Sequence, residues 1–522
     1  MRLGEVLVRR HLLSAADVTV ALERQRLNTG RLSESLIALG LMTTDQLVAL
    51  AQDTPATPRT VAETGISHGN LFNLMLKFMR LESCEIMPEF AERMKLPLSV
   101  IQELMDDAVR RGLVQTLGSV QVGAATYVRY SLSAQGHAAA AEAVQQNLYL
   151  GPAPVSLRAL QRQVLNQRLK NDRLDADTLR GGFEGLVVPE HYIDRLLPAV
   201  NAGRTILLFG PPGNGKTSIA TRIATLFKQA VHIPYAFEVD GQIIKVFDAS
   251  LHKLSVPDAK IAAIAEKGGL QLEAFDDRWV ICHRPVAMAG GELTLEMLDL
   301  QYNHETKYYD APLHVKALNG VFLIDDFGRQ QVDPKDLLDR WIVPMENRID
   351  YLKLNTGKSF SLPFDELLMF STNAHPSDLM DPAFLRRIPY KIKLFAPTPE
   401  EYYRIFDLVA KANGLELTDE VFDSVVERLT TRTQFGLAYF QPKFICDQVV
   451  EACRCLNLSP RLTKVRAADA LANLYVEIED EQGAEPARLT GSPIRARANR
   501  ARDRAEPDAR FATPGLQPAA IQ

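Results

Sequence analysis

The chain has 522 residues, which corresponds to about three or four domains at roughly 150 residues each. Hydrophobic residues make up 46% of it, and no run approaches the roughly 20 apolar residues of a membrane span. The net charge of −5 excludes a general electrostatic attraction to nucleic acid or to an anionic membrane. The N-terminus lacks the features of a secretory signal and the five cysteines follow no zinc-binding spacing, so we expect a cytoplasmic protein with reduced thiols.

The N-terminal segment of the chain is a repeat. Arg2–Val8 aligns with Arg31–Ile37, and the match continues where Leu12-Leu13 aligns with Leu41-Met42. Each unit predicts two short helices around a turn, and two such units can bury their apolar faces against each other. We therefore expect a small helical repeat domain over residues 1–55.

This repeat resembles the N-terminal domain of the ATPases of type II secretion and type IV pilus assembly, in which a motif beginning R-L-G occurs in tandem. In that family such tandem motifs can bind cyclic di-GMP. The resemblance implies that Arg2 and Arg31 contact a guanine or a phosphate, with Gln25 beside them. His11 and Ser33 stand where the motif has glycines, so a docking module without a ligand is the alternative.

Residues 64–150 predict three helices followed by a β-hairpin, an order that resembles a winged helix. The third helix, Leu98–Arg111, carries Glu103, Asp106 and Asp107 at its polar positions. Carboxylates on a recognition helix repel phosphates. We therefore expect a structural or protein-contact domain here and not a nucleic-acid partner.

A linker over residues 151–180 leads to the segment Gly210–Thr217, which fits the phosphate-loop pattern G-x-x-x-x-G-K-[ST]. The apolar run Thr205–Phe209 predicts a buried strand before it, and the spacing of apolar residues predicts a helix after it. In that context backbone N–H groups and a helix N-terminus bind phosphates, Lys216 reaches the β- and γ-phosphates, and the Thr217 hydroxyl ligates Mg²⁺. The residues predicted to bind ATP are Gly210, Pro211, Pro212, Gly213, Asn214, Gly215, Lys216, Thr217 and Ser218.

A second apolar run, Gly320–Ile324, predicts a buried strand that ends in two acids. Asp325 and Asp326 follow it directly, at the carboxyl end of the strand, where nucleotides bind in parallel α/β sheets. Asp325 is placed to hold Mg²⁺ through water, as a Walker B acid does. Asp326 is placed to orient and deprotonate the attacking water.

A third strand, Leu367–Asn373, ends in an amide, and a pair of arginines follows in Asp381–Ile388. This order of motifs resembles the AAA+ ATPases, with the MoxR-like or chaperone type as the nearer match. The resemblance implies that Asn373 is the sensor 1 residue, which binds the attacking water or the γ-phosphate. It also implies an arginine finger, for which Arg387 is favoured over Arg386, that reaches a neighbouring subunit. The family usually has glutamate as the second Walker B acid, so another acid could be the base.

Residues 181–398 are therefore expected to form an AAA+ nucleotide-binding domain with a parallel sheet, and residues 399–480 a helical lid. Lys443 is the candidate for the basic residue with which such lids sense the nucleotide. The long insertion before the second strand includes the runs Ile233–Val239 and Gln242–Phe247, which predict a hairpin turned by Asp240-Gly241. It also includes the tyrosine-rich segment 302–312, and these parts predict either a pore that grips a polypeptide or an enlarged subunit interface. Residues 481–522 contain too few large apolar groups to fold alone.

Together these features favour a multidomain α/β enzyme, an ATP hydrolase that works as a homo-oligomer, with a hexamer as the expected state, and remodels a protein client. The N-terminal repeat associates it with pilus or secretion machinery. Two alternatives stay open. One is a DNA-acting ATPase or transcriptional regulator that uses the winged helix. The other is a nucleotide-gated scaffold that hydrolyses ATP slowly, because Asp326 replaces the usual glutamate.

Overall fold

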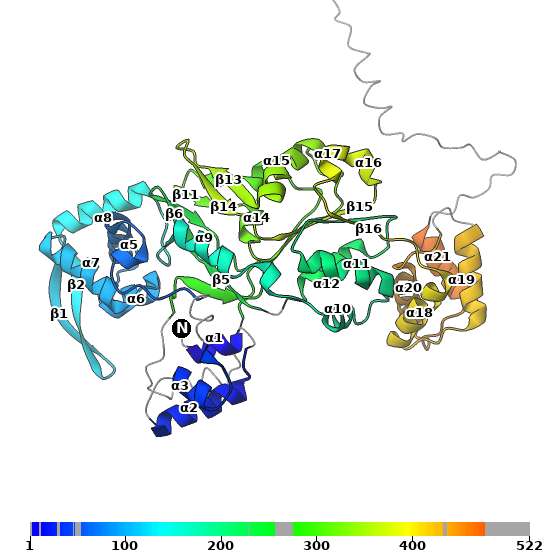
Figure 1. The fold of residues 1–522 in the computed structure, drawn as a ribbon, viewed down its shortest axis with the longest axis horizontal. Helices are drawn as coiled ribbons and strands as arrows, with labels where there is room; N and C mark the ends of the chain where they lie inside the picture. The colour runs from blue at the N-terminus through cyan, green and yellow to red at the C-terminus, as the bar shows by residue number, and fades with distance from the viewer. Residues whose placement is uncertain are drawn as a thin grey trace, which may run out of the picture. The chain divides into compact units, whose positions relative to one another are not determined.

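The structure is a computed structural model (Figure 1). It describes residues 3–9, 12–28, 32–44, 46, 54–227, 229–255, 275–431 and 436–475. The candidate contacts Arg2 and Arg31, and the segment 481–522, lie outside this range. The chain divides into two compact units, Met1–Ala470 and Leu471–Gln522. Within the described part, no helix has the length and apolar character needed to cross a membrane, and no disulfide joins the cysteines.

The N-terminal helices are α1 (Leu3–Arg9), α2 (Ala15–Asn28) and α3 (Leu32–Ala38). Apolar side chains from the two repeat units share one core, in which Leu3 and Leu7 meet Leu32 and Leu36. Ile281, from the insertion far along the chain, belongs to the same core. The N-terminal helices therefore pack against the body of the protein as well as against each other.

The next part, the helix–hairpin domain of residues 64–150, has its elements in the expected order. They are η1 (Ala62–Thr64) at its start, α5 (His68–Leu81), α6 (Met87–Met94), α7 (Leu98–Arg110), β1 (Val114–Val122), β2 (Ala125–Leu132) and α8 (Ala134–Gln146). Two of the acids of α7 have partners inside the protein. Glu103 accepts a hydrogen bond from the Val61 N–H at 2.9 Å, and Asp107 pairs with Arg111 at 2.8 Å.

The linker and the insertion together build a second sheet, with strand order β10-β11-β7-β6-β3. The linker holds β3 (Val155–Ser156), α9 (Leu157–Asn166), η2 (Leu169–Asn171) and α10 (Ala176–Gly182). The insertion holds β5 (Val231–Pro234), β6 (Ala236–Val239), β7 (Gln242–Lys245), β8 (Trp279–Cys282), η3 (Glu296–Leu298), β10 (Gln301–Asn303) and β11 (Tyr308–Asp310).

One sequence prediction about the insertion needs correction. The run Ile233–Val239 reads as a single strand, but the structure divides it at Tyr235 into β5 and β6. β5 pairs with β8, whereas β6 forms the expected hairpin with β7. Asp240 and Gly241 have φ values of 52° and 80°, as a two-residue hairpin turn of type I′ requires.

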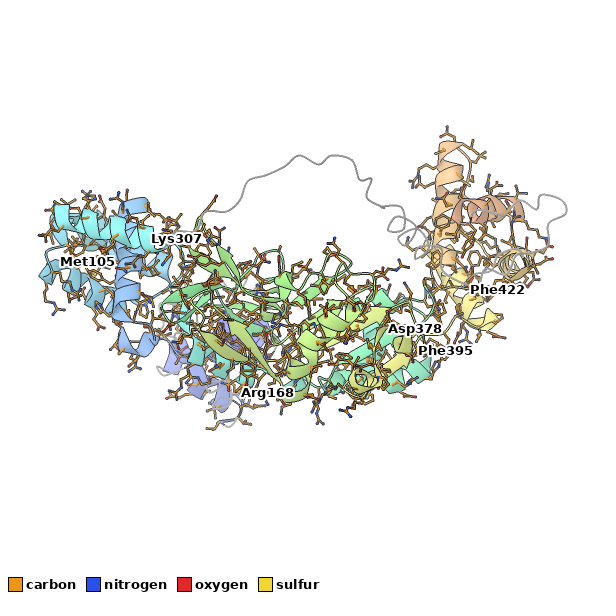
Figure 2. The ribbon with its side chains drawn as sticks, turned by 90° about the horizontal axis from the view of Figure 1, so that it is seen from above. Met105, Arg168, Lys307, Asp378, Phe395 and Phe422 are labelled. Atoms are coloured by element: carbon orange, nitrogen blue, oxygen red, sulfur yellow. The ribbon has the colours of Figure 1, made fainter. Side chains whose placement is uncertain are left out.

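Two tyrosines of the insertion, Tyr302 and Tyr309, pack against each other. Tyr309 is 1% exposed, and its hydroxyl accepts a hydrogen bond from the Asn355 N–H at 2.9 Å. The Tyr302 ring lies 4.8 Å from it. At the turn between β10 and β11, Lys307 donates to the carbonyl oxygen of Gln145 in α8, which joins the insertion to the helix–hairpin domain (Figure 2).

The nucleotide-binding region is built on a parallel sheet with strand order β16-β4-β15-β12-β9, which confirms the expected mixed α/β fold. Its strands are β4 (Ile206–Phe209), β9 (Val286–Ala289), β12 (Val321–Ile324), β15 (Leu367–Thr372) and β16 (Tyr390–Lys393). Its helices are α11 (Glu190–Asn201), α12 (Lys216–Ala224), α14 (Leu313–Lys316), α15 (Pro334–Asn347), α16 (Pro376–Leu379) and α17 (Pro382–Leu385), and a hairpin joins β13 (Ile349–Lys353) to β14 (Ser359–Pro363).

Alternate residues of the strands face two different cores, because successive side chains of a strand point to opposite faces. Ile206 and Leu208 pack in the core that α11 and α12 cover. Leu207 and Phe322 pack in the core that includes Trp341 of α15. Figure 1 shows α11 and α12 on one side of the sheet and α14 and α15 on the other. Burial on both faces is typical of parallel sheets.

The expected lid is helical in the described part. Its helices are α18 (Pro399–Ala412), α19 (Asp419–Thr431), α20 (Gln441–Cys455) and α21 (Lys464–Leu474). Thr398 and Glu401 form a capping box at the start of α18, where the Thr398 hydroxyl accepts from the Glu401 N–H. This capping box satisfies N–H groups that the first turn of a helix otherwise leaves without partners.

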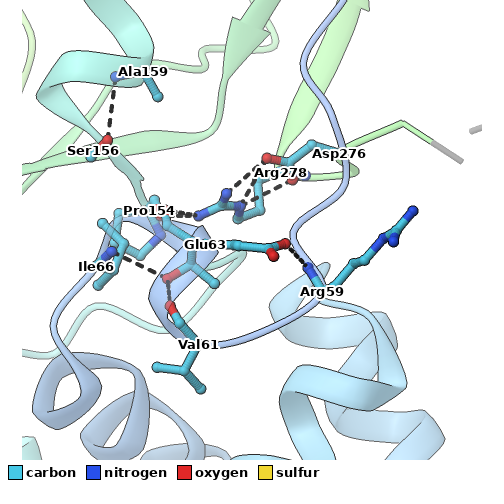
Figure 3. A network of polar contacts seen from close by, with 10 residues as sticks. Arg59, Val61, Glu63, Ile66, Pro154, Ser156, Ala159, Asp276 and Arg278 are labelled. Carbon is cyan, nitrogen blue, oxygen red and sulfur yellow. Dashed lines mark hydrogen bonds and ion pairs between the residues drawn. The ribbon is translucent and has the colours of Figure 1, made fainter.

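A buried ion pair ties the start of the helix–hairpin domain, and the linker that follows this domain, to the insertion (Figure 3). Arg278 and Asp276 pair at 2.8 Å, and each side chain is 4% exposed. The same guanidinium donates to the carbonyl oxygens of Thr64 at 3.1 Å and Pro154 at 3.0 Å. The Asp276 N–H donates to the carbonyl oxygen of Pro55. Arg278 thus holds segments that are far apart in the sequence.

Removing one partner of this pair should destabilise the protein strongly. Arg278→Ala leaves Asp276 buried without its cation, and we expect the free energy of unfolding to fall by about 3–5 kcal/mol. Urea unfolding followed by tryptophan fluorescence, to which the buried Trp279 and Trp341 both contribute, measures the change. Arg59→Ala is the control, since Arg59 is exposed and its side chain has no partner in the described part of the chain. Equal stabilities for the two variants would contradict the prediction.

Candidate nucleotide-binding site

The phosphate loop connects β4 to α12, as the sequence predicts. Gly210, Gly213 and Gly215 have φ values of 145°, 77° and 76°, a region that side chains disfavour. A Cβ atom at Gly210 would lie 2.1 Å from the carbonyl oxygen of Leu394 in the sequence after β16. The loop therefore needs glycine both for its conformation and for its approach to the neighbouring chain segment.

Lys216 lies at the first position of α12, and its side chain bends back over the loop. Its Nζ donates to the carbonyl oxygens of Gly210 at 3.0 Å and Pro211 at 2.9 Å. Burial lowers the pKa of Lys216, while the carboxylates of Asp326 and Asp325 oppose that shift. Charge-assisted bonds to phosphate are stronger than these bonds to neutral carbonyls. The ammonium is thus placed to exchange its carbonyl partners for phosphate oxygens.

Thr217 and Asp325 meet although the sequence separates them widely. The Thr217 Oγ1 donates to Asp325 Oδ2 at 2.8 Å. The other carboxylate oxygen of Asp325, Oδ1, is buried and has no hydrogen-bond partner among the described residues. A hydroxyl beside a carboxylate with an unused oxygen is a set of hard oxygen donors that suits Mg²⁺. The residues present therefore fit the magnesium ion that a bound triphosphate brings with it.

Asp326 and Asn373 also meet, from the ends of β12 and β15. Asn373 Nδ2 donates to Asp326 Oδ1 at 3.1 Å. The backbone of Asp326 is left-handed, with a φ of 48°. Both residues line the same cavity as Lys216 and Thr217. The structure therefore brings together the residues predicted as base and as sensor 1.

The predicted arginines stand apart from the cavity of their own chain. Arg386 is exposed, and its side chain has no partner in the described part. Arg387 is 18% exposed, and it donates from Nε to Glu346 of α15 at 2.6 Å and from a terminal nitrogen to the Ala383 carbonyl. Neither arginine lines the cavity.

The cavity has a volume of about 660 Å³ and extends from the phosphate loop to the lid. Its apolar part was not predicted. Phe395, at the end of the core (Figure 2), lines it, as do residues of the segment before α11 and of the lid. The Phe440 ring lies so close to the loop that a Cβ at Gly213 would be 2.4 Å from it. The missed apolar residues include Leu186, Val188, Tyr192, Ile405, Leu408 and Phe444.

Two further predicted site residues, Lys443 and Asn214, lie in the cavity wall but make no contact with the other site residues among the hydrogen bonds described. Lys443 lines the cavity, but its side chain is 71% exposed and pairs with Asp447 at 2.5 Å within α20. Asn214, also in the cavity wall, is buried, and its amide atoms have no partner among the described residues. In the N-terminal module, Gln25 of α2 is 2% exposed. It is the one predicted cyclic di-GMP contact within the described part.

Comparisons with known proteins agree with an ATPase in coarse terms. Residues 398–473 match a family described as a domain of unknown function (DUF8689). The chain is 27% identical over 197 residues to a vesicle-fusing ATPase of Caenorhabditis elegans, across 34% of this chain and 22% of that protein. The chain thus spans about a fifth of the length of this relative. Over the matched part it is AAA+ ATPase-like.

Solved structures of RuvB from Thermotoga maritima show a weaker similarity. A single-residue variant has a TM-score of 0.32 and 15% identity, over 57% of this chain and 73% of that chain. A structure described as a Holliday junction branch migration motor has a TM-score of 0.29 and 15% identity, over 62% and 72%.

Lys216→Ala should prevent tight binding of a triphosphate. The variant loses the ammonium that donates to the phosphate-loop carbonyls, and charged hydrogen bonds of this kind change affinity by roughly 10- to 100-fold. Titration with a fluorescent ATP analogue measures the dissociation constant. Lys335→Ala, at an exposed lysine of α15, is the matched control. Equal affinities for the two variants would place the phosphates elsewhere.

Proposed function

We propose that the chain is an oligomeric ATPase that hydrolyses ATP to remodel a protein partner. The observation that carries the proposal is that Lys216, Thr217, Asp326 and Asn373 all line one cavity beside the phosphate loop. Asp325 adjoins this cavity through its hydrogen bond with Thr217. The apolar remainder of the cavity, between core and lid, has the character expected for a site that binds a nucleoside base.

In the proposed reaction, loop N–H groups and Lys216 bind the β- and γ-phosphates and offset their charge. Thr217 and Asp325 hold Mg²⁺, which when bound neutralises charge on the phosphate oxygens. Asp326 orients a water molecule in line with the γ-phosphate and accepts its proton. Asn373 fixes the Asp326 carboxylate through the observed hydrogen bond and so restricts its rotation.

The proposed assembly is a homo-oligomer, a hexamer in keeping with the AAA+ resemblance. Arg386 and Arg387 lie outside the cavity of their own chain, and in the assembly they reach the site of a neighbouring subunit. Arg386 has a free guanidinium in the described part, whereas Arg387 would have to leave Glu346. A monomer would then lack one cation of the active site, which couples hydrolysis to assembly.

The finer biological setting rests on the N-terminal repeat alone. We propose a cytoplasmic role in pilus or secretion machinery, with cyclic di-GMP as a regulator that binds the repeat. A DNA-acting role is not favoured, since Glu103 and Asp106 are exposed carboxylates on α7, whereas Asp107 is buried and paired with Arg111. A change in ATP hydrolysis rate on addition of cyclic di-GMP would support the regulatory part, and an unchanged rate would leave the repeat as a docking module.

Asp326→Asn should retain ATP binding and lose turnover. The amide keeps the size of the side chain but cannot accept the proton of water, and general-base groups contribute roughly 10²- to 10⁴-fold to rates. Phosphate release gives kcat, and the fluorescent analogue gives the affinity. Asp336→Asn, at an exposed acid in the first turn of α15, is the control. If Asp326→Asn hydrolyses ATP as fast as this control, another acid is the base.

Arg387→Ala should lower turnover without changing ATP affinity. Mixing it with Lys216→Ala chains should restore part of the turnover, because some sites then take an intact loop from one subunit and an intact arginine from another. Arg386→Ala is the companion variant at the adjacent position. Phosphate release is measured against the mixing ratio. A loss that mixing never recovers would exclude a shared active site.

A further inference from the structure

The backbone of the proposed catalytic base is unusual. Asp326 has a φ of 48°, in the left-handed region that residues with side chains rarely adopt. Aspartate enters this region more readily than glutamate, because its short side chain can form local hydrogen bonds. The conformation thus accounts for the aspartate at a position where the resembling family usually has glutamate. It also requires contacts that hold the turn in place.

One set of contacts comes from Gln330, four residues further along the same turn. Its Nε2 donates to the carbonyl oxygen of Asp325 at 3.0 Å and lies 3.4 Å from that of Asp326. The same nitrogen donates to the Gly290 carbonyl, after β9, at 3.3 Å. Its Oε1 accepts from the Gly328 N–H at 2.8 Å. The Gln330 amide therefore closes the turn and fastens it to the neighbouring strand end.

A second set of contacts comes from β15, on the other side. The Phe327 N–H donates to the Ser371 carbonyl at 2.7 Å, and the buried Thr372 hydroxyl donates to the Phe327 carbonyl at 2.7 Å. Asn373, the next residue, donates to the Asp326 side chain. The peptide that follows Asp326 is thus fixed by the same strand end that orients its carboxylate.

We propose that Gln330 and Thr372 are positioning residues of hydrolysis, which hold the left-handed backbone of Asp326 so that its short carboxylate meets the attacking water. This inference rests on the proposed ATPase function. Neither side chain lies where the phosphate loop binds its ligand, so both act on the rate of the chemical step through Asp326 and not on nucleotide affinity.

The test compares Gln330→Ala with Gln331→Ala in the full-length chain. Gln331 is the next residue, is exposed, and has no side-chain partner in the described part. We expect Gln330→Ala to lower kcat on the order of 100-fold, the cost of misplacing a reacting group by about 1 Å, with the affinity for the fluorescent analogue unchanged. Gln330→Glu keeps the size of the side chain but lacks the amide donor, so its kcat should fall by a similar factor.

A double variant separates positioning from a general structural role. In the Asp326→Asn background, Gln330→Ala should cause no further loss, because the group through which it acts is already gone. If Gln330→Ala does not fold, Thr372→Val and Thr372→Ser take its place. Thr372→Val should lower kcat, and Thr372→Ser, which keeps the hydroxyl, should recover most of it.

The outcomes distinguish the inference from the function on which it rests. A wild-type chain that binds the analogue but releases no phosphate would overturn the proposed function, and this inference with it. Wild-type hydrolysis together with equal kcat values for Gln330→Ala and Gln331→Ala would overturn the inference alone. A further loss from Gln330→Ala in the Asp326→Asn background would do the same.

Discussion

The parallel strands β4, β15 and β12 are neighbours in one sheet and end at the same edge, and the polar contacts of the site depend on this arrangement. Because the strands are parallel, their carboxyl ends lie at one edge of the sheet. The phosphate loop, Asn373 and the two aspartates each follow a carboxyl end, so all of them lie at this edge. The hydrogen bond from Thr217 to Asp325 joins the segment after β4 to that after β12, and the bond from Asn373 to Asp326 joins the segments after β15 and β12. Each is therefore a consequence of strand order.

The elements that the sequence predicts well are those whose cause is local. The phosphate loop, the β6–β7 turn and the start of α18 each depend on residues within one short segment. The division at Tyr235 was missed because the apolar run continues across it, and only the pairing of β5 with β8 ends the first strand. The apolar wall of the cavity was missed for a similar reason. Phe395 and Phe440 belong to no motif, and tertiary packing alone brings them to the loop.

The same distinction explains what the sequence leaves open about the catalytic acid. Aspartate in place of glutamate looks like a weakened base when the residue type is considered by itself. The structure adds the left-handed backbone of Asp326 and the contacts from Gln330 and Thr372, which together set the position of the carboxylate. The residue type alone does not show this position, because how far a carboxylate extends into the site depends on the backbone conformation as well as on side-chain length.

The contacts around β8 give the N-terminal modules a physical route to the phosphate loop. β5 follows the phosphate-loop helix α12 in the chain and pairs with β8. Arg278, directly before β8, holds the start of the helix–hairpin domain and the linker that follows it, while Ile281 within β8 packs against the N-terminal helices. Physical contact alone does not couple two sites. Coupling also needs an element that has two conformations, with ligand binding at each site changing the balance between them. β5 is joined to the phosphate-loop helix along the chain, and β8 with Arg278 before it contacts both N-terminal modules, so a nucleotide-dependent shift of this pair would move both modules at once.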